Sequence, residues 1–415
     1  MIFDLGRLPS PAGKRLAVRV SPAAQAALRG GHPWVFDQSI VSVGGKPDPQ
    51  AGDLAVIFDD YRRFLAVGLY DPHSPLRIRV LQHREPASIG RAWFRERLAA
   101  AAALRASLPD TDTDAYRLVH GENDGLPGLV VDRYADHLVL KLYTAAWLPW
   151  LPPLLDALLE VQPAATVVLR LSRQTAGAPG LPNGLTDGVA LVGKAPSGPV
   201  AFRENGLRFA ADLARGQKTG FFLDQRDNRS RVEKLARGRR ALNVFAYTGG
   251  FSLYAARGGA PEVLSVDLSE PALRDAAANF ALNRDVPAVA ACRHSTLGGD
   301  AFELLAQLGR GGARFGLVVV DPPAFAKRAS EAPAALRAYT RLTELALKVT
   351  APGGVVALAS CSSRVPADEF FATVTQAAVA ARRPLREIER TGHPVDHPAT
   401  FPEAAYLKCL FAVAA

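Results

Sequence analysis

The sequence predicts an α/β protein whose C-terminal half folds around a parallel sheet with helices on both faces. Three observations in the 415 residues predict this class. Short strands separated by Gly, Pro and Asp occupy the first part of the chain, a β-β-α-β block follows, and apolar strands then alternate with amphipathic helices. We therefore expect three domains: a mostly β module at 1–86, a small central α/β domain at 87–205 and a doubly wound domain at 206–415.

The first module contains four apolar runs, each bounded by turn residues. They predict strands at 16–20, 53–59, 64–70 and 76–81, with a short helix at 22–28. Short strands at this spacing favour a small barrel-like β module.

The central region begins with an Ala-, Leu- and Arg-rich helix at 93–107. Two strands joined by the tight connection Ala135-Asp136 follow, then a helix and another strand: 128–134, 137–143, 148–160 and 165–171. The stretch 138–159 is apolar but holds Lys141, Asp156 and three prolines, so we read it as strand and helix, not as a membrane span.

The last domain shows the β-α-β-α rhythm. Strands are predicted at 241–246, 262–267, 317–320 and 354–360, and helices at 225–235, 251–257, 270–282, 300–308, 334–349 and 366–380. A final strand at 405–413 could add an edge to the sheet.

The formal charge of +9 is compatible with a polyanionic partner such as nucleic acid, or with solubility alone. Residues 206–240 hold ten basic and four acidic side chains, a patch that could hold RNA phosphates or could be a solvated helix face. Three widely spaced cysteines and an N-terminus without the apolar core of a signal peptide predict a reducing, cytoplasmic location.

A strand, a glycine turn and a helix start follow one another at 242–252. In a doubly wound sheet this first turn faces the ligand, and its residues are expected to line a cofactor: Phe245, Tyr247, Thr248 and Gly249. Asp267, 17 residues after Gly250, ends the next strand and could accept from ribose hydroxyls, and Asp300 is placed to lie near an adenine.

The dinucleotide fingerprint and the phosphate-binding GxxxxGK[ST] loop are both absent. S-adenosyl-L-methionine (SAM) has a ribose but no phosphate, so it fits this turn better than a pyrophosphate ligand does. The alternative is that Gly249-Gly250 only makes a tight turn.

Asp321-Pro322-Pro323-Ala324-Phe325 follows an apolar strand. The two prolines fix the backbone and remove two donors, so free carbonyls could accept from a nucleobase amino group. Phe325 offers a face for base stacking, and Asp321 also borders the cofactor. The alternative is a loop that merely ends the strand.

Cys361 sits just past the strand at 354–360, at the sheet edge where ligands bind in such folds. Carbon 5 of cytosine is a weak nucleophile, but a thiolate that adds at carbon 6 loads electron density onto it. The alternative for Cys361 is a buried small hydrophobe, which is the interpretation we favour for Cys292 and Cys409.

These motifs resemble, over nearly the whole chain, the bacterial 23S ribosomal RNA large-subunit methyltransferase I family of SAM-dependent RNA cytosine-5 methyltransferases. The matching segments are GHPWVF at 31–36, HGENDGLPGL at 120–129, GQKTGFFLDQR at 216–226, FAYTGG at 245–250, DPP at 321–323, SCS at 360–362 and DHP at 396–398.

The resemblance implies an N-terminal PUA domain, a small central domain and a Rossmann-like methyltransferase domain. It implies that SAM is held by Gln217 and by the segment 222–226, which contributes Phe222, Asp224, Gln225 and Arg226, and that Cys361 is the nucleophile. Ala324 stands where many RNA cytosine-5 methyltransferases have a second cysteine. The base that releases the product is then open, with Asp321 or a water as candidates.

The expected partner is large-subunit ribosomal RNA, with no membrane and with a homodimer left open. No metal is expected, because His120, Glu122 and Asp124 lie in a Gly- and Pro-containing turn. Two other functions stay open: an RNA methyltransferase that acts on a base nitrogen, and a non-catalytic RNA-binding assembly factor.

Overall fold

The computed structural model describes residues 2–415, which form two compact units. Unit 1 contains the residues up to 206 together with 211–223 and 395–401. Unit 2 contains 207–210, 224–394 and 402–415. Near the C-terminal end of the chain, the seven residues 395–401 thus belong to unit 1, while the segments on both sides of them belong to unit 2.

The first part of unit 1 is a six-stranded sheet with strand order β2-β6-β5-β4-β1-β3. Leu16, Val18 and Val20 point into its core while Ala17 and Arg19 are exposed, which is the alternation expected of a half-buried strand. The elements are β1 (Leu16–Val20), α1 (Pro22–Arg29), β2 (Trp34–Phe36), β3 (Ile40–Gly44), β4 (Leu54–Phe58), β5 (Phe64–Tyr70) and β6 (Leu76–His83). Strands β2 and β3 were not predicted.

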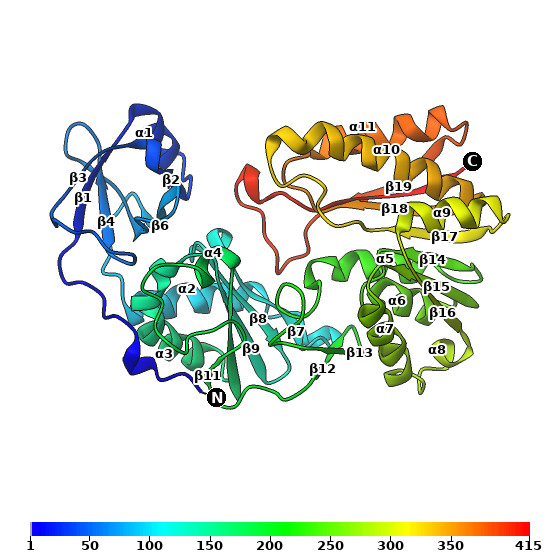
Figure 1. The fold of residues 1–415 in the computed structure, drawn as a ribbon, viewed down its shortest axis with the longest axis horizontal. Helices are drawn as coiled ribbons and strands as arrows, with labels where there is room; N and C mark the ends of the chain where they lie inside the picture. Colours follow the sequence, from blue (N-terminus) through cyan, green and yellow to red (C-terminus); the bar gives the residue numbers. More distant parts are fainter. Residues whose placement is uncertain (1) are drawn as a thin grey trace. The chain divides into compact units, whose positions relative to one another are not determined.

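The second part of unit 1 is a five-stranded sheet with order β11-β10-β9-β8-β7, and α2 and α3 pack together beside it (Figure 1). The expected β-β-α-β block is present as β8, β9, α3 and β10, and β7 and β11 extend it. The elements are α2 (Arg91–Leu104), β7 (Ala115–His120), β8 (Leu129–Tyr134), β9 (His137–Leu142), α3 (Leu151–Val161), β10 (Thr166–Leu171), α4 (Arg173–Ala176) and β11 (Ala190–Val192). None of the helices within residues 2–415 combines the length and apolar character that crossing a membrane requires.

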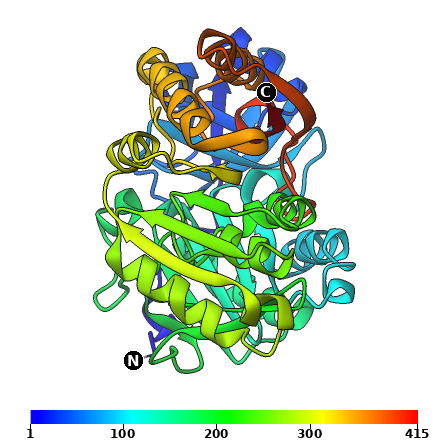
Figure 2. The same ribbon diagram turned by 90° about the vertical axis from the view of Figure 1, so that its right-hand side faces the viewer.

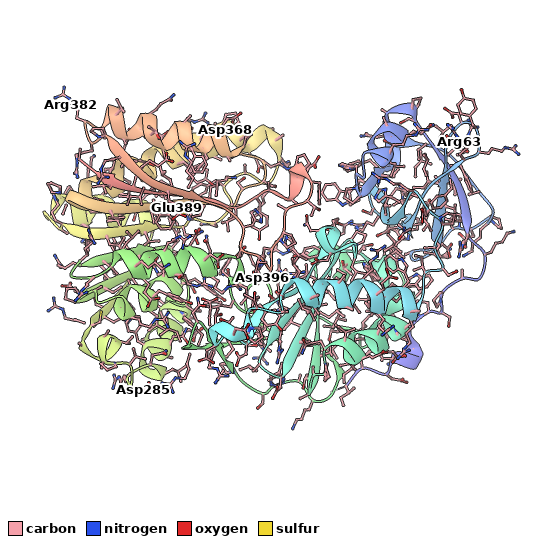
Figure 3. The ribbon with its side chains drawn as sticks, turned by 180° about the vertical axis from the view of Figure 1, so that it is seen from behind. Arg63, Asp285, Asp368, Arg382, Glu389 and Asp396 are labelled. Carbon is pink, nitrogen blue, oxygen red and sulfur yellow. The ribbon has the colours of Figure 1, made fainter. Side chains whose placement is uncertain are left out.

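A buried ionic network fastens the segment 395–401 to unit 1. The Arg105 guanidinium, 1% exposed, forms two hydrogen bonds of 2.8 and 2.7 Å with Asp124 and donates to the Asp396 carbonyl at 3.0 Å. The carboxylate of Asp396, which is labelled in Figure 3, in turn accepts from the backbone N–H of Arg117 at 3.0 Å. The HGENDGLPGL and DHP motifs therefore meet in one structural network.

The residues His120, Glu122 and Asp124 point to different partners. Asp124 is held by Arg105, and Glu122 accepts from the indole N–H of Trp34 at 2.9 Å. The His120 ring lies 5.0 Å from that of His397. Among residues 2–415, no group of three or more His, Cys, Asp or Glu side chains is arranged to hold a metal ion.

Unit 2 is built on a seven-stranded sheet with order β16-β15-β14-β17-β18-β20-β19. Five strands are parallel, and β20 pairs antiparallel with both β18 and β19. The strands are β14 (Ala241–Val244), β15 (Glu262–Asp267), β16 (Arg293–Gly298), β17 (Phe315–Val320), β18 (Thr350–Ser360), β19 (Leu385–Thr391) and β20 (Lys408–Ala414). The expected edge strand β20 is therefore an interior strand, because the unpredicted β19 covers its outer side.

Helices cover both faces of this sheet (Figures 1 and 2). Helices α5, α6 and α7 form one layer, and α9, α10 and α11 form the other. Their bounds are α5 (Arg226–Leu235), α6 (Gly250–Arg257), α7 (Glu270–Leu282), α8 (Pro287–Ala291), α9 (Ala301–Arg310), α10 (Ala332–Val349) and α11 (Ala367–Ala380). Two further strands, β12 (Val200–Glu204) and β13 (Leu207–Ala211), lie where the chain passes from unit 1 to unit 2. The run 317–320 is buried throughout, as expected of a parallel strand covered on both faces.

We predict that Arg105→Ala destabilises unit 1 by about 3–5 kcal/mol, because it leaves the buried Asp124 carboxylate without its counter-ion. All four tryptophans of the chain belong to unit 1, so urea denaturation followed by tryptophan fluorescence measures this unit. The matched control is Arg203→Ala, whose ion pair with Asp112 is about half exposed on both sides and should contribute less than about 1 kcal/mol. Equal losses in the two variants would contradict the prediction.

Candidate active site

The register of the parallel strands brings four chain segments to one edge of the unit 2 sheet. Val244 at the end of β14 pairs with Val266 of β15 on one side and with Val320 of β17 on the other. Val320 also pairs with Leu358 of β18. The order of the strands reverses at β14, which is the switch point where doubly wound sheets bind their ligands.

The loop after β14 has an unusual backbone. Phe245, Tyr247 and Gly249 all have positive φ angles, of 62°, 48° and 77°. Non-glycine residues adopt this region rarely, and such residues cluster at ligand sites. A side chain at Gly249 would place its Cβ atom 2.8 Å from the Cβ of Ala276 on α7, so the glycine is needed for close packing as well as for its conformation.

Asp267 joins this loop to the end of β15. Its carboxylate accepts from the backbone N–H of Tyr247 at 2.7 Å and from that of Ser269 at 2.8 Å. Each oxygen keeps a further lone pair, so the half-buried carboxylate is able to accept from ribose hydroxyls, and this role of Asp267 stays a prediction.

The buried side chain of Thr248 supports a ligand at this loop. Its hydroxyl oxygen has no hydrogen-bond partner, although the residue is only 5% exposed. Buried polar atoms are nearly always paired in folded proteins, so an orphaned one needs an explanation. A polar, phosphate-free ligand such as SAM fits a loop with this hydroxyl and the neighbouring Asp267 carboxylate.

The other predicted cofactor residues fall into three groups. Asp224, Gln225 and Arg226 are all at most 3% exposed at the start of α5, where Asp224 accepts from the Tyr406 hydroxyl at 2.8 Å. Asp300 is exposed and caps α9 by accepting from the backbone N–H groups of Phe302 and Glu303. Gln217 and Phe222 belong to unit 1, where Gln217 is exposed and the Phe222 ring lies 4.3 Å from Lys218 Nζ.

Cys361 lies beside the Asp-Pro-Pro segment. Its Sγ is 3.8 Å from the carbonyl oxygen of Pro322 and is oriented to donate to it. Cys361 and Asp321 are both half-buried, while Pro322 is buried and Pro323 is exposed. The thiol and the carbonyl acceptors therefore share one place at the carboxyl ends of β17 and β18.

Three contacts that the sequence analysis did not identify hold the chain around Cys361. The Tyr339 hydroxyl on α10 is 2.8 Å from Ser360 Oγ, and Ser362 donates to the Ala326 carbonyl at 2.9 Å. Lys408 Nζ donates to the carbonyls of 362, 365 and 406. The available signal was a single lysine at the start of the apolar run KCLFAVA at 408–414.

The Phe325 side chain packs partly against the interior of unit 2. Its ring centroid lies 5.2 Å from that of Tyr339 and 6.5 Å from that of Phe302, and the side chain packs against the core of unit 2. It remains half-buried, so base stacking on its free surface stays a prediction.

The other two cysteines have different surroundings. Cys409 is 2% exposed on β20, and burial raises the pKa of its thiol well above the usual range. Cys292 precedes β16, at the opposite edge of the sheet from Cys361, and burial raises the pKa of Cys292 to about 11.

The basic segment 206–240 is less available than its composition suggested. Arg226 and Arg229 are each 2% exposed. Arg231 is paired at 2.9 Å with Glu389 on β19, the residue labelled in Figure 3, and Arg240 is paired with Glu262 at 3.0 Å. Several of the ten basic side chains are thus buried or ion-paired within unit 2. Fewer of them are available to bind RNA phosphates than the composition of the segment suggests.

We predict that Gly249→Ala weakens SAM binding by at least about tenfold in calorimetric titration, because the methyl group must displace the loop or α7. Gly312→Ala is the matched control, since its φ of 74° carries the same left-handed conformation but nothing lies within 4 Å of the added Cβ. Both variants should lose about 1 kcal/mol of stability from the backbone, and only Gly249→Ala should lose affinity. A tight complex of Gly249→Ala with SAM would rule out this placement of the cofactor loop.

Comparison with known proteins identifies two domain families in this chain. The S-adenosylmethionine-dependent methyltransferase family matches residues 190–412, and a PUA-like domain matches residues 18–83. A ribosomal RNA large subunit methyltransferase of Deinococcus radiodurans is 50% identical over 97% of this chain and 98% of its own length. Ribosomal RNA large subunit methyltransferase I of Photobacterium profundum is 38% identical over 92% of this chain and 96% of its own.

Solved structures share the fold over the full length. A methyltransferase in complex with SAH superimposes with a TM-score of 0.81 at 20% identity, covering 96% of this chain and 99% of that one. A SAM-dependent methyltransferase from Streptococcus mutans gives a TM-score of 0.79 at the same identity and coverage. The chain is therefore a SAM-dependent methyltransferase with an N-terminal PUA-like domain, and it belongs to the ribosomal RNA large subunit methyltransferase I family.

Proposed function

We propose that this protein methylates carbon 5 of a cytosine in 23S ribosomal RNA through a covalent adduct with Cys361. The observation that carries the proposal is the position of the Cys361 thiol, 3.8 Å from the Pro322 carbonyl at the ligand-binding edge of the sheet. The names of the curated relatives support large-subunit ribosomal RNA as the substrate.

The proposed chemistry begins with the Cys361 thiolate. It adds to carbon 6 of the pyrimidine, and the electron pair of the 5,6 double bond moves toward carbon 5 and makes it nucleophilic. SAM supplies an electrophilic methyl group on a sulfonium when it is bound. The carbonyls of the Asp-Pro-Pro segment would hold the exocyclic amino group of the base while this bond forms.

Product release needs a base. After methylation, carbon 5 must lose its proton, and the electron pair of that bond restores the 5,6 double bond and expels the Cys361 sulfur as thiolate. Asp321 directly follows β17, at the same edge of the sheet as Cys361, so we propose that its carboxylate, directly or through a water, receives this proton. Ala324 offers no thiol for the step.

We propose that the protein acts in the cytoplasm. Bacterial ribosomal RNA is made there, and cysteine thiols remain reduced in that compartment.

We predict that Cys361→Ala abolishes methylation of 23S ribosomal RNA and leaves SAM binding unchanged. The substrate is RNA from a strain that lacks the protein, bisulfite sequencing detects 5-methylcytosine, and calorimetry measures SAM affinity. Cys292→Ala is the matched control, because its thiol lies at the other edge of the sheet and the variant should keep full activity.

A second readout tests the adduct itself. RNA that carries 5-fluorocytidine cannot lose a proton from carbon 5, so wild-type protein should remain covalently attached to it and Cys361→Ala should not. Full activity of Cys361→Ala, or a methyl group on adenine or guanine, would favour methylation of a base nitrogen. Absence of SAM binding in the wild type would favour a non-catalytic RNA-binding role.

A further inference from the structure

Strand β20 carries a buried lysine beside the proposed nucleophile. The strand reads Lys-Cys-Leu-Phe-Ala-Val-Ala, and Lys408 is only 2% exposed. In the antiparallel pairing of β18 with β20, Lys408 stands opposite Ser360, the residue before Cys361. A lysine is seldom buried unless its charge has partners, so this position needs an explanation.

The ammonium group of Lys408 is saturated by backbone carbonyls. It donates to Ser362 O, to Val365 O at 2.7 Å and to Tyr406 O at 3.2 Å. An ammonium has three N–H groups, so all of them are used. Two of the three acceptors belong to the turn that follows Cys361, which the lysine therefore holds in one conformation.

No carboxylate within residues 2–415 forms an ion pair with Lys408, so its charge is offset only by carbonyl dipoles. Burial lowers the pKa of Lys408 to about 8, and the negative form of Cys361 acts in the opposite direction. Such an interaction is mutual, because a cation that is stabilised by a thiolate stabilises that thiolate equally. Cys361 is thus the group that best complements this charge.

The other ionisable groups around Cys361 do not supply a positive charge in its place. Asp321, directly after β17, would oppose a thiolate, and burial raises the pKa of Tyr339 on α10 to about 12, which keeps its hydroxyl neutral. Cys409 on β20 is buried and neutral. Arg364, in the turn after Cys361, is exposed, so water screens its charge.

We propose that Lys408 is a positioning residue for Cys361, whose buried ammonium fixes the turn at 361–365 and holds the thiol in its reactive thiolate form. The inference rests on the proposed function in that it assigns Cys361 the role of nucleophile. Lys408 itself does not exchange a proton with the substrate, because each of its N–H groups is engaged by the backbone.

We test this by measuring how fast iodoacetamide alkylates Cys361 as a function of pH, in full-length protein, with mass spectrometry of the Cys361 peptide. Lys408→Met should raise the midpoint of the alkylation profile by about one pH unit, which lowers the rate at neutral pH about tenfold. Lys408→Arg should restore most of the wild-type midpoint. Lys348→Met, an exposed lysine on α10, should leave the profile unchanged.

The wild type provides a test that needs no variant. Its Cys361 should titrate at lower pH than the same residue in concentrated urea, and equal midpoints would overturn the proposal. An unchanged midpoint in folded Lys408→Met, verified by thermal denaturation and SAM binding, would overturn it as well. Alkylation does not depend on methyl transfer, so an active Cys361→Ala would refute the proposed function while the profiles still report on Lys408.

Discussion

The register of four parallel strands is the constraint on which the site depends. Because Val244 pairs with Val266 and Val320, and Val320 with Leu358, the proposed cofactor loop at 245–249, the Asp-Pro-Pro segment and Cys361 all follow the sheet at the same edge. A slip of one residue in β18 would turn its side chains to the opposite face and move the thiol away from the Pro322 carbonyl. The apolar strands prevent such a slip, since their side chains are buried on both faces.

Different contacts order the two segments at this edge, the loop after β14 and the turn after Cys361. On the cofactor side, three positive φ angles and close contact between Gly249 and α7 fix the backbone, and Asp267 ties the loop to the neighbouring strand. On the thiol side, a buried charge on Lys408 orders the turn through carbonyl groups. Both devices order the backbone in advance, so that less conformational entropy is lost when ligands bind.

Elements of the fold could be predicted from the sequence where a local residue pattern determines them. The alternation of strands and helices in unit 2 and the helix at 270–282 both follow from local residue patterns. Strands β16 and β19 were missed because Arg-His-Ser-Thr-Leu-Gly and Leu-Arg-Glu-Ile-Glu-Arg-Thr lack the apolar runs of interior strands. They lie at the two edges of the sheet, where one side of each strand has no neighbour and polar residues are tolerated.

What could not be read from the sequence depends on contacts between distant segments. Asp396 contacts Arg105 and Arg117 because residues 395–401 belong to unit 1 although the segments before and after them belong to unit 2. No local residue pattern predicts this change of unit. Arg226 and Arg229 contribute to the basic composition of 206–240, but each is only 2% exposed and so adds little to the charge of the surface. A residue type fixes the chemistry that is available, whereas tertiary structure decides whether a charge meets solvent or a partner.

The three cysteines narrow the proposed chemistry further. Cys409 is enclosed in the sheet opposite Ala359, and Cys292 precedes β16 and so lies at the amino edge. Cys361 is half-buried at the carboxyl edge, whereas Cys409 is only 2% exposed, so the proposed mechanism has no second accessible thiol for release of the product. In this mechanism the proton on carbon 5 passes to an oxygen base, and we propose Asp321, which follows β17 at the same edge of the sheet, for that role. The proposed mechanism therefore separates the two roles, with sulfur as nucleophile and leaving group and oxygen as base.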